Sequence, residues 1–345
     1  MSKYIRTAAY LLLFAALLAG CVCCAAETAS LELALTPAPT ASPAPALTLP
    51  PTPVPTVTPM PVKTPSPTTL LDGRTDIFTY GITEQKLSYT SYTVSCTCYR
   101  VIDEENYSGR MRYYVADIYV KDVTSIRSAF SGSGYGHTAY ESLRVLARNV
   151  NAVVSISGDY CTNRRLGLVI RDGVVYRTEP DPDRDVGVLY KDGTFKTYLA
   201  GEVPVEEILA ADPWQSWCFG PSLLDENGKA KSSFNSDVTK ANPRAVFGYY
   251  EPGHYCFVVV DGRQKKAAGM RMEELSRLME SLGCTAAINL DGGATAQMAW
   301  RDSLVNDPET KRHLSDFIYV LPGEEGVRPD VKLFIRACEP LYAAK

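Results

Sequence analysis

The chain has few histidines and no broad excess of positive charge. Only three histidines occur, His137, His254 and His313, and none has a partner in the sequence that suggests a zinc site or a catalytic triad. The 35 basic and 39 acidic residues give a net charge of −4. A chain with this balance offers no basic field for nucleic acid, so nucleic-acid binding is not expected. No internal repeat is evident, which argues against a solenoid.

The ten cysteines do not follow the pattern of a disulfide framework. Cys21, Cys23 and Cys24 belong to the N-terminal segment, and the other seven are dispersed and odd in number. Cys256 and Cys284 lie within apolar, strand-like runs, so we expect them to be small core residues. One or two disulfides remain compatible with an exported protein.

The N-terminal segment is typical of an export signal. Lys3 and Arg6 precede an apolar run over residues 8–18. The following Leu18-Ala19-Gly20-Cys21 resembles a bacterial lipobox. In such lipoproteins the peptide is cut before the cysteine, and the thiol of Cys21 would then carry the lipid.

The sequence divides the chain into three parts. We assign residues 1–24 to a signal peptide with lipobox, while cleavage after Ala25 or Ala26 and an uncleaved membrane anchor remain open alternatives. Residues 25–71 are rich in proline and threonine, which favours an extended, disordered stalk. The globular body is expected over 72–345. All three interpretations place that body outside the cytoplasm, either anchored to the membrane or secreted.

Hydrophobic periodicity predicts both strands and helices in the body. A strand over 255–261, a helix over 271–282 and a strand over 285–290 form a plausible βαβ unit with neighbouring parallel strands. A strand over 113–120 precedes them. We therefore expect the α/β class (mixed α+β), with a mixed sheet, flanking helices and an N-terminal β extension.

Turn residues predict several hairpins. Asp-Gly pairs mark turns within 169–176 and within 189–195. The segment 244–250 is expected to pair with 255–261. A helix from 143 to 150 leads into a buried strand over 152–157.

Three acids follow predicted strands, each beside a glycine. They are Asp159, Asp261 and Asp291. In open α/β sheets ligands bind at the carboxyl ends of strands, and Gly292 and Gly293 leave room for another molecule to approach Asp291. Two Asp-Gly pairs in the predicted hairpins show, however, that the dipeptide also serves as a plain turn here. Spacing alone leaves both a shared site and separate turns open.

Six short motifs occur in a fixed order. They are Ser157-Gly158-Asp159-Tyr160, Phe219-Gly220-Pro221-Ser222-Leu223, Asn242-Pro243-Arg244, Asp261-Gly262-Arg263, Asn289-Leu290-Asp291-Gly292-Gly293 and Arg312-His313-Leu314-Ser315-Asp316. Each motif is weak by itself, but the ordered set resembles the phosphodiester glycosidase family over about 146–321. That family includes the enzyme that uncovers mannose-6-phosphate by removing N-acetylglucosamine from a phosphodiester. Its bacterial members are often exported and linked to exopolysaccharide or cell-wall glycans.

The chain departs from the family pattern at several positions. Ser157 stands where the family usually has asparagine, and Cys161 replaces an aromatic residue. After the two glycines the family commonly has glycine or glutamine and then two serines, whereas this chain has Ala294, Thr295 and Ala296. These departures bear on substrate and activity more than on fold.

The resemblance implies hydrolysis of a sugar-1-phosphodiester, of the α-N-acetylglucosaminyl type. An oxocarbenium-like transition state calls for a nearby carboxylate, and a leaving phosphate is suited to arginine. We expect Asp159 and Asp291 to form the catalytic acid pair, with Asp261 as a third acid of the site. Arg244 and Arg312 would hold the phosphate, although Arg244 could instead brace a strand edge.

The remaining expected substrate-binding residues come from the last two motifs. They are Asn289, Gly292, Gly293, Thr295 and Asp316. Asp316 lies four residues from Arg312, so a simple surface ion pair is the alternative for these two. No cofactor is expected, although three clustered acids could instead hold calcium.

The expected partners are a sugar-phosphodiester or phosphorylated glycan and, through the lipid or anchor, a membrane. Two other functions remain open. One is a non-catalytic envelope protein of the same fold that binds phosphorylated glycans, and the other is a surface scaffold module.

Overall fold

The computed structural model describes residues 70–71, 74, 76–103, 110–132, 134–136 and 139–326. The predicted signal peptide with Cys21, and the predicted stalk except for its last two residues, lie outside this part of the chain. The described residues all belong to one compact unit. In the described part, no helix has the length and apolar character needed to cross a membrane.

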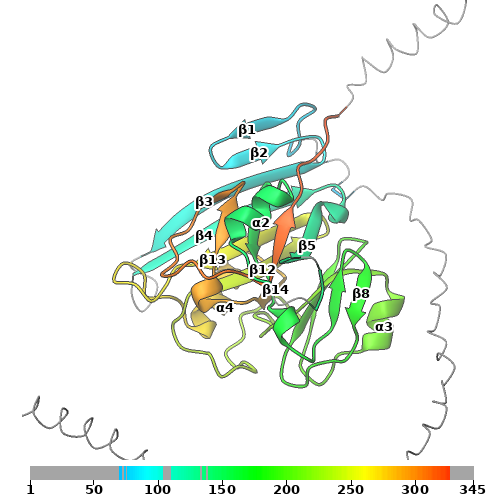
Figure 1. Cartoon of the computed structure of the whole chain (residues 1–345), viewed down its shortest axis with the longest axis vertical. Helices are drawn as coiled ribbons and strands as arrows, with labels where there is room; N and C mark the ends of the chain where they lie inside the picture. The colour runs from blue at the N-terminus through cyan, green and yellow to red at the C-terminus, as the bar shows by residue number, and fades with distance from the viewer. Residues whose placement is uncertain are drawn as a thin grey trace, which may run out of the picture. The chain divides into compact units, whose positions relative to one another are not determined.

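The largest sheet has seven strands and brings the N-terminal strands beside the central ones (Figure 1). Its spatial order is β1 (Thr83–Gln85), β2 (Ser88–Thr90), β3 (Val94–Asp103), β4 (Met111–Val120), β13 (His254–Val260), β12 (Arg244–Glu251) and β14 (Ala286–Asn289).

Three smaller sheets complete the β structure. The five-stranded sheet has the order β16 (Ser303–Leu304), β15 (Met298–Trp300), β6 (Val154–Ser157), β17 (Asp316–Val320) and β5 (Ile126–Phe130). The three-stranded sheet contains β10 (Phe195–Tyr198), β9 (Val186–Tyr190) and β11 (Pro213–Cys218), and β7 (Val169–Arg171) pairs with β8 (Val174–Arg177).

The helices of the described part are short. The α-helices are α2 (Leu143–Asn149), α3 (Val205–Ala210) and α4 (Met272–Ser281). Single 3-10 turns are η1 (Val123–Ser125), η2 (Cys161–Asn163) and η3 (Gly293–Thr295).

The predicted α/β class is wrong, because the fold is mostly β. Within the described residues every strand pair is antiparallel. The strand β12 lies between β13 and β14 and pairs with both, so these two strands run in the same direction without pairing. The N-terminal strands β1 to β4 extend the largest sheet at one edge, where β4 pairs with β13.

Burial on both faces explains why β13 suggested a parallel sheet. Phe257 and Val259 pack into a core shared with the other sheets, whereas Val258 and Val260 pack on the opposite face with Leu275 of α4. A strand covered on both faces has a continuous apolar sequence, which is most common in parallel sheets. Here the same burial is reached with antiparallel neighbours.

The shorter-range predictions are confirmed. Hairpins form between β7 and β8 and between β9 and β10, and β12 pairs with β13. The helix α4 occupies the predicted segment. The predicted core cysteines Cys256 and Cys284 are free and buried, with their sulfur atoms 3.7 Å apart.

Candidate active site

The ends of strands from different sheets meet at one place. Asp291 follows β14 of the largest sheet, and Gly158 follows β6 of the five-stranded sheet. The backbone N–H of Asp291 donates to the carbonyl of Gly158 at 3.0 Å. The hydroxyl of Ser157 donates to the carbonyl of Asp291, also at 3.0 Å. Ser157, a departure from the family pattern, thus helps to fix the position of Asp291.

Asp291 is the residue that two neighbouring pockets share. Burial raises the pKa of its carboxyl to about 6, while the hydroxyl of Thr295 and the guanidinium groups of Arg164 and Arg312 oppose that rise. Asp159 adds a smaller upward shift. A raised pKa together with nearby cations is typical of a carboxyl that takes part in a reaction.

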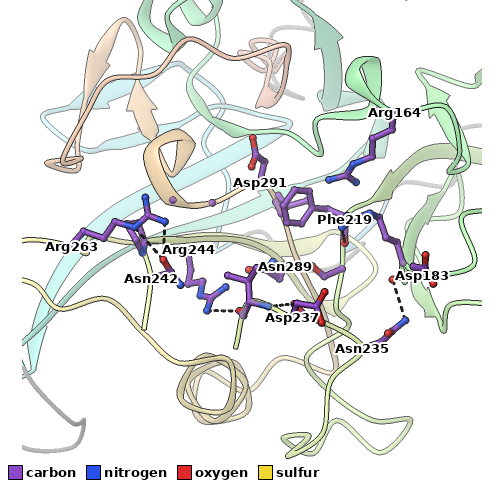
Figure 2. A pocket seen from close by; sticks show the side chains of 18 residues that line it. Arg164, Asp183, Phe219, Asn235, Asp237, Asn242, Arg244, Arg263, Asn289 and Asp291 are labelled. Atoms are coloured by element: carbon purple, nitrogen blue, oxygen red, sulfur yellow. Dashed lines mark hydrogen bonds between the residues drawn. The ribbon is translucent and has the colours of Figure 1, made fainter. Parts of the chain in front are cut away.

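The larger pocket, here called the arginine pocket, has a volume of about 650 Å³. Arginines line it on several sides, and Figure 2 shows Arg164 and Arg263 on opposite sides with Asp291 between them. Its lining side chains and backbone come from Arg164, Asp183, Arg184, Phe219, Gly220, Asn235, Ser236, Asp237, Val238, Asn242, Pro243, Arg244, Arg263, Asn289, Leu290, Asp291, Gly292 and Gly293.

Two of these arginines are arranged around one aromatic ring. The guanidinium carbon of Arg164 lies 4.7 Å from the ring centroid of Phe219, and that of Arg184 lies 5.8 Å from it. Arg164 also donates to the carbonyl of Cys218 at 2.7 Å. The ring contacts and the carbonyl orient these cations at the wall of the pocket.

Arg244 lines the arginine pocket and also binds backbone carbonyls of the neighbouring chain segments. Its Nε donates to the carbonyl of Met270 at 3.1 Å, and its Nη2 donates to the carbonyls of Val238 and Lys240 at 2.9 and 2.6 Å. Burial lowers the pKa of Arg244 to about 10, and the nearby charge of Arg263 contributes. Arg244, which the sequence predicts to contact the phosphate, therefore already donates to three backbone carbonyls.

Asn289 has an unmatched acceptor beside the arginine pocket. Its side-chain Nδ2 donates to the carbonyl of Gly220 at 2.9 Å, which fixes the amide. Its Oδ1 is buried and has no hydrogen-bond partner among the described residues. Buried acceptors are normally satisfied, so a donor from a bound molecule or from water fits this position.

The smaller pocket, here called the tyrosine pocket, has a volume of about 310 Å³. Two half-exposed tyrosines and one arginine border it together with small polar side chains. Its lining consists of Tyr140, Tyr160, Asp291, Thr295, Arg312, His313, Leu314 and Ser315. Thr295 donates to the carbonyl of Gly292 at 2.6 Å, so its hydroxyl is held close to the backbone beside Asp291.

Behind these pockets lies a fully buried group of charges. Asp159 is 0% exposed, and its Oδ1 accepts a hydrogen bond from Nη2 of Arg171 at 2.6 Å. Its Oδ2 accepts from the backbone N–H of Cys218 at 2.8 Å. Asp316 lies 3.7 Å from the same Arg171 nitrogen. One guanidinium therefore serves two carboxyl groups.

The two buried carboxyls have opposite pKa shifts. Burial opposes the charge of Asp159, but Arg171, Asp316 and the N–H of Cys218 lower the pKa of Asp159 below its usual value. Burial and the charge of Asp159 raise the pKa of Asp316 to about 7. Of the two carboxyls, Asp316 therefore holds the proton that this pair loses last as the pH rises.

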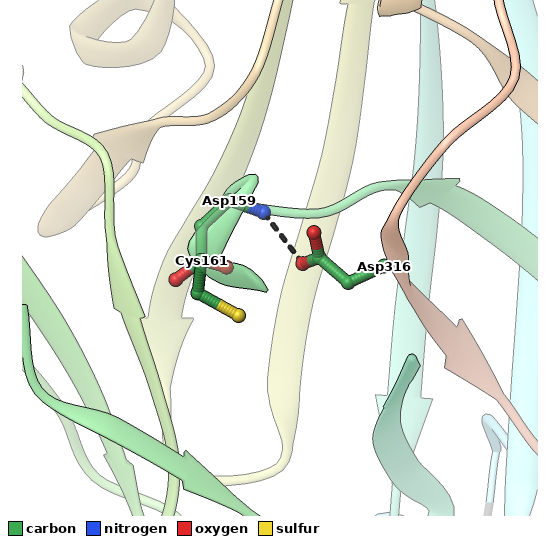
Figure 3. A group of neighbouring side chains, drawn as sticks. All are labelled: Asp159, Cys161 and Asp316. Carbon is green, nitrogen blue, oxygen red and sulfur yellow. Dashed lines mark hydrogen bonds between the residues drawn. The ribbon is translucent and has the colours of Figure 1, made fainter. Parts of the chain in front are cut away.

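Asp316 also fixes the chain that follows β6 (Figure 3). Its Oδ2 accepts from the backbone N–H of Asp159 at 2.8 Å, and its Oδ1 accepts from that of Tyr160 at 2.9 Å. A Cβ at Gly158 would overlap the Asp316 carboxylate, so only glycine fits there. Asp316 does not pair with Arg312 among the described contacts. Its bonds instead hold Tyr160 in a left-handed conformation, with φ of 61°.

Asp261 is separated from the two pockets. It borders neither of them, although it follows β13, which runs in the same direction as β14. Its carboxylate accepts from Nδ2 of Asn306 at 3.0 Å and from the backbone N–H of Asp307 at 3.2 Å. Burial raises the pKa of Asp261, and these donors oppose the shift. The structure thus brings Asp159 and Asp316 behind Asp291 but leaves Asp261 in a separate loop contact.

The expected alternative of a calcium site does not fit the residues described. The group of possible ligands found among them is Asp159, Cys161 and Asp316. Calcium takes six to eight oxygen ligands, whereas this group includes a thiol and is already neutralised by Arg171.

Sequence reasoning missed Arg171 and Arg164. Arg171 lies in a predicted hairpin whose turn looked purely structural, and nothing local distinguishes it from a surface cation. Arg164 lies five residues after Asp159, close to the first motif, and this proximity was the available signal. Arg171 could not be assigned without knowing that β7 brings its guanidinium to the carboxylate of Asp159 after β6.

Comparisons with known proteins give a family match and a related protein. The family model described as "Phosphodiester glycosidase" (NAGPA) matches residues 149–321, half of the chain. The SPbeta prophage-derived protein YomE of Bacillus subtilis strain 168 is 29% identical over 185 residues, 51% of this chain. The match covers only 29% of the length of YomE.

A solved enzyme structure shares the fold. The catalytic domain of the zebrafish N-acetylglucosamine-1-phosphodiester alpha-N-acetylglucosaminidase, solved auto-inhibited by its pro-peptide, aligns with a TM-score of 0.56 and 20% identity over 67% of this chain and 84% of that one. A hypothetical protein from Synechocystis aligns with a TM-score of 0.49 and 16% identity over 66% of this chain and 62% of that one.

Proposed function

The chain belongs to the phosphodiester glycosidase family, and from that premise we propose that it hydrolyses the bond between the anomeric carbon of a sugar and the oxygen of a phosphodiester. The observation that carries this proposal is the position of Asp291, which borders both pockets and lies near the cations Arg164 and Arg312. Its carboxylate is suited to stabilise positive charge at the anomeric carbon, and the cations are suited to the phosphate that leaves.

The leaving group explains why the site needs cations more than an acid. A phosphate monoester departs as a stable anion, so strong proton donation is unnecessary. Arginine holds such an anion through planar, charge-assisted hydrogen bonds. Arg164, at the wall of the arginine pocket, is a better candidate for this contact than Arg244, whose Nε and Nη2 hold backbone carbonyls.

Asp159 does not contact the substrate and acts by positioning other residues. Its carboxylate is fully buried, borders neither pocket, and is engaged by Arg171 and the N–H of Cys218. We assign Asp159, Arg171 and Asp316 a positioning role, in which they fix the chain that supports Asp291. The negative charge of Asp159 also contributes to the raised pKa of Asp291.

A second candidate is a phosphoglycan-binding protein without turnover. Ala294 and Ala296 favour it, because the family commonly has polar side chains at some of these positions and both alanines here are buried. Incubation with UDP-N-acetylglucosamine, followed by detection of free reducing sugar, separates the two candidates. Release of sugar supports the enzyme. Binding of the same compound without release supports the second candidate.

The pH dependence of kcat/KM provides a further test. If Asp291 acts as the carboxylate, kcat/KM rises about tenfold per pH unit below pH 6 and levels off above it. Arg312 lowers the pKa of Asp291, so Arg312→Ala should move the midpoint to higher pH. Arg165→Ala, at an exposed arginine that borders neither pocket, is the control. An unchanged midpoint in Arg312→Ala would count against Asp291 as the titrating group.

We also propose that the protein is exported and lipid-anchored through Cys21, and that its substrate is an envelope or extracellular phosphoglycan. The lipobox-like sequence before Cys21 supports this proposal. Expressed as the full chain in a bacterium, the protein should fractionate with membranes, and Cys21→Ala should release it. Equal membrane association of both proteins would instead indicate an uncleaved anchor.

A further inference from the structure

The two pockets differ in chemistry, and only Asp291 borders both of them. A sugar phosphodiester also has two chemically different ends, a neutral sugar and an anionic phosphate with its attached group. Because the bond between them must lie beside Asp291, each end occupies one pocket. Charge and shape decide which end occupies which pocket.

The arginine pocket suits the phosphate end. Arg164, Arg184, Arg244 and Arg263 border it, against a single arginine, Arg312, in the tyrosine pocket. Each guanidinium has five N–H donors. Among the described residues, the guanidinium of Arg164 donates one hydrogen bond, to the carbonyl of Cys218, and therefore has donors left for a ligand. The pocket also has room for the group esterified to the phosphate, since its volume is about 650 Å³.

Acidic side chains also border the arginine pocket, but they do not outnumber its arginines. Asp183 and Asp237 border it together with Asp291. The buried Oδ1 of Asn289 adds an acceptor without charge. These acceptors suit hydroxyl or N–H donors on the group beyond the phosphate.

The tyrosine pocket suits a sugar ring. Tyr140 and Tyr160 are 43% and 37% exposed, so part of each ring can contact a ligand. One side of the Tyr160 ring faces the guanidinium carbon of Arg164, 5.9 Å from the ring centroid. Aromatic faces bind the apolar side of a ring while neighbouring polar groups bind its hydroxyls. Ser315 and Thr295 supply hydroxyls, and the volume of about 310 Å³ is less than half that of the arginine pocket.

The backbone of Tyr160 adopts an unfavourable conformation. A non-glycine residue with φ of 61° is uncommon, and such strain concentrates at functional sites. Asp316 stabilises it by accepting the backbone N–H of Tyr160. The buried charges therefore orient a wall of the tyrosine pocket as well as the chain beside Asp291.

We propose that the tyrosine pocket binds the sugar whose anomeric carbon reacts at Asp291, and that the arginine pocket binds the phosphate and the group esterified to it. This assignment rests on the proposed function. It makes Tyr160 a determinant of sugar binding and Arg184 a determinant of binding at the phosphate end.

Product inhibition tests the assignment. Hydrolysis of UDP-N-acetylglucosamine at the anomeric carbon yields N-acetylglucosamine and UDP, and each product reports on one pocket. In Tyr160→Ala the inhibition constant of N-acetylglucosamine should rise about tenfold while that of UDP stays within about twofold. In Arg184→Ala the constant of UDP should rise about tenfold or more while that of the sugar stays unchanged.

Matched variants control for general effects. Tyr99→Ala and Arg165→Ala remove an exposed tyrosine and an exposed arginine that border neither pocket, and both constants should stay at wild-type values. The opposite pattern, equal changes of both constants, or no change in either variant would overturn the assignment while leaving the hydrolase intact. Absence of turnover by the folded wild-type protein would instead contradict the proposed function, and the assignment with it.

Discussion

Asp291→Asn is expected to reduce kcat on a sugar phosphodiester by at least about a thousandfold, with little change in KM. The amide preserves the size of the side chain and leaves the backbone bonds to Gly158 and Ser157 in place. It removes the one ionisable group that both pockets share. The loss should therefore fall on the chemical step, and the measurement is release of reducing sugar under saturating substrate.

Asp302→Asn provides the matched control for this result. Asp302 borders neither pocket, so the variant should keep wild-type kcat and KM. Substrate binding by Asp291→Asn, measured by calorimetry, should remain close to the wild-type KM. Retention of more than about a tenth of the wild-type kcat in Asp291→Asn would show that another group carries the reaction.

Arg171→Met is expected to lower the free energy of unfolding by about 3–5 kcal/mol at neutral pH. Methionine fills part of the volume but leaves Asp159 and Asp316 buried without their cation. Arg171→Lys keeps the charge and should cost less, although it cannot reproduce all the guanidinium contacts. Urea unfolding followed by circular dichroism measures both variants.

The loss in free energy of unfolding caused by Arg171→Met should depend on pH. Without the cation the pKa of Asp159 in the folded protein rises from below its unfolded value to above it, and the pKa of Asp316, already raised by burial, rises further. Carboxyls of this kind favour the folded state at low pH, and their contribution is lost as pH rises through the folded pKa. The deficit should therefore be smaller near pH 5 than near pH 8.

The double variant Arg171→Met/Asp159→Asn separates charge from packing. Removing one buried carboxylate should recover part of the stability that Arg171→Met loses. If Arg171→Met does not fold, recovery of a folded protein by the second substitution gives the same answer. A pH-independent deficit without recovery would show that Arg171 acts by packing alone.

Local features of this chain were predictable because they depend on neighbours in the sequence. The Asp172-Gly173 turn specifies the hairpin of β7 and β8, and the spacing of apolar residues specifies α4. The carboxylate at the end of β14 and its two glycines were visible for the same reason. The position at the end of a strand therefore singled out a residue that borders both pockets.

Strand pairing was not predictable, because it depends on contacts far apart in the sequence. An apolar strand such as β13 has the same sequence pattern in parallel and antiparallel surroundings when both faces are buried. The insertion of β12 between β13 and β14 also separated Asp261 from Asp291. The ion pair between Asp159 and Arg171 joins two sheets, so no spacing rule could identify it.

Hydrolysis in water enriched in oxygen-18 tests the central claim most directly. If Asp291 serves cleavage at the anomeric carbon, the heavy oxygen from water appears in the anomeric hydroxyl of the released sugar, and the released phosphate carries none. Mass spectrometry of the two products distinguishes the alternatives. Heavy oxygen in the phosphate would show cleavage of the phosphorus–oxygen bond and contradict the account.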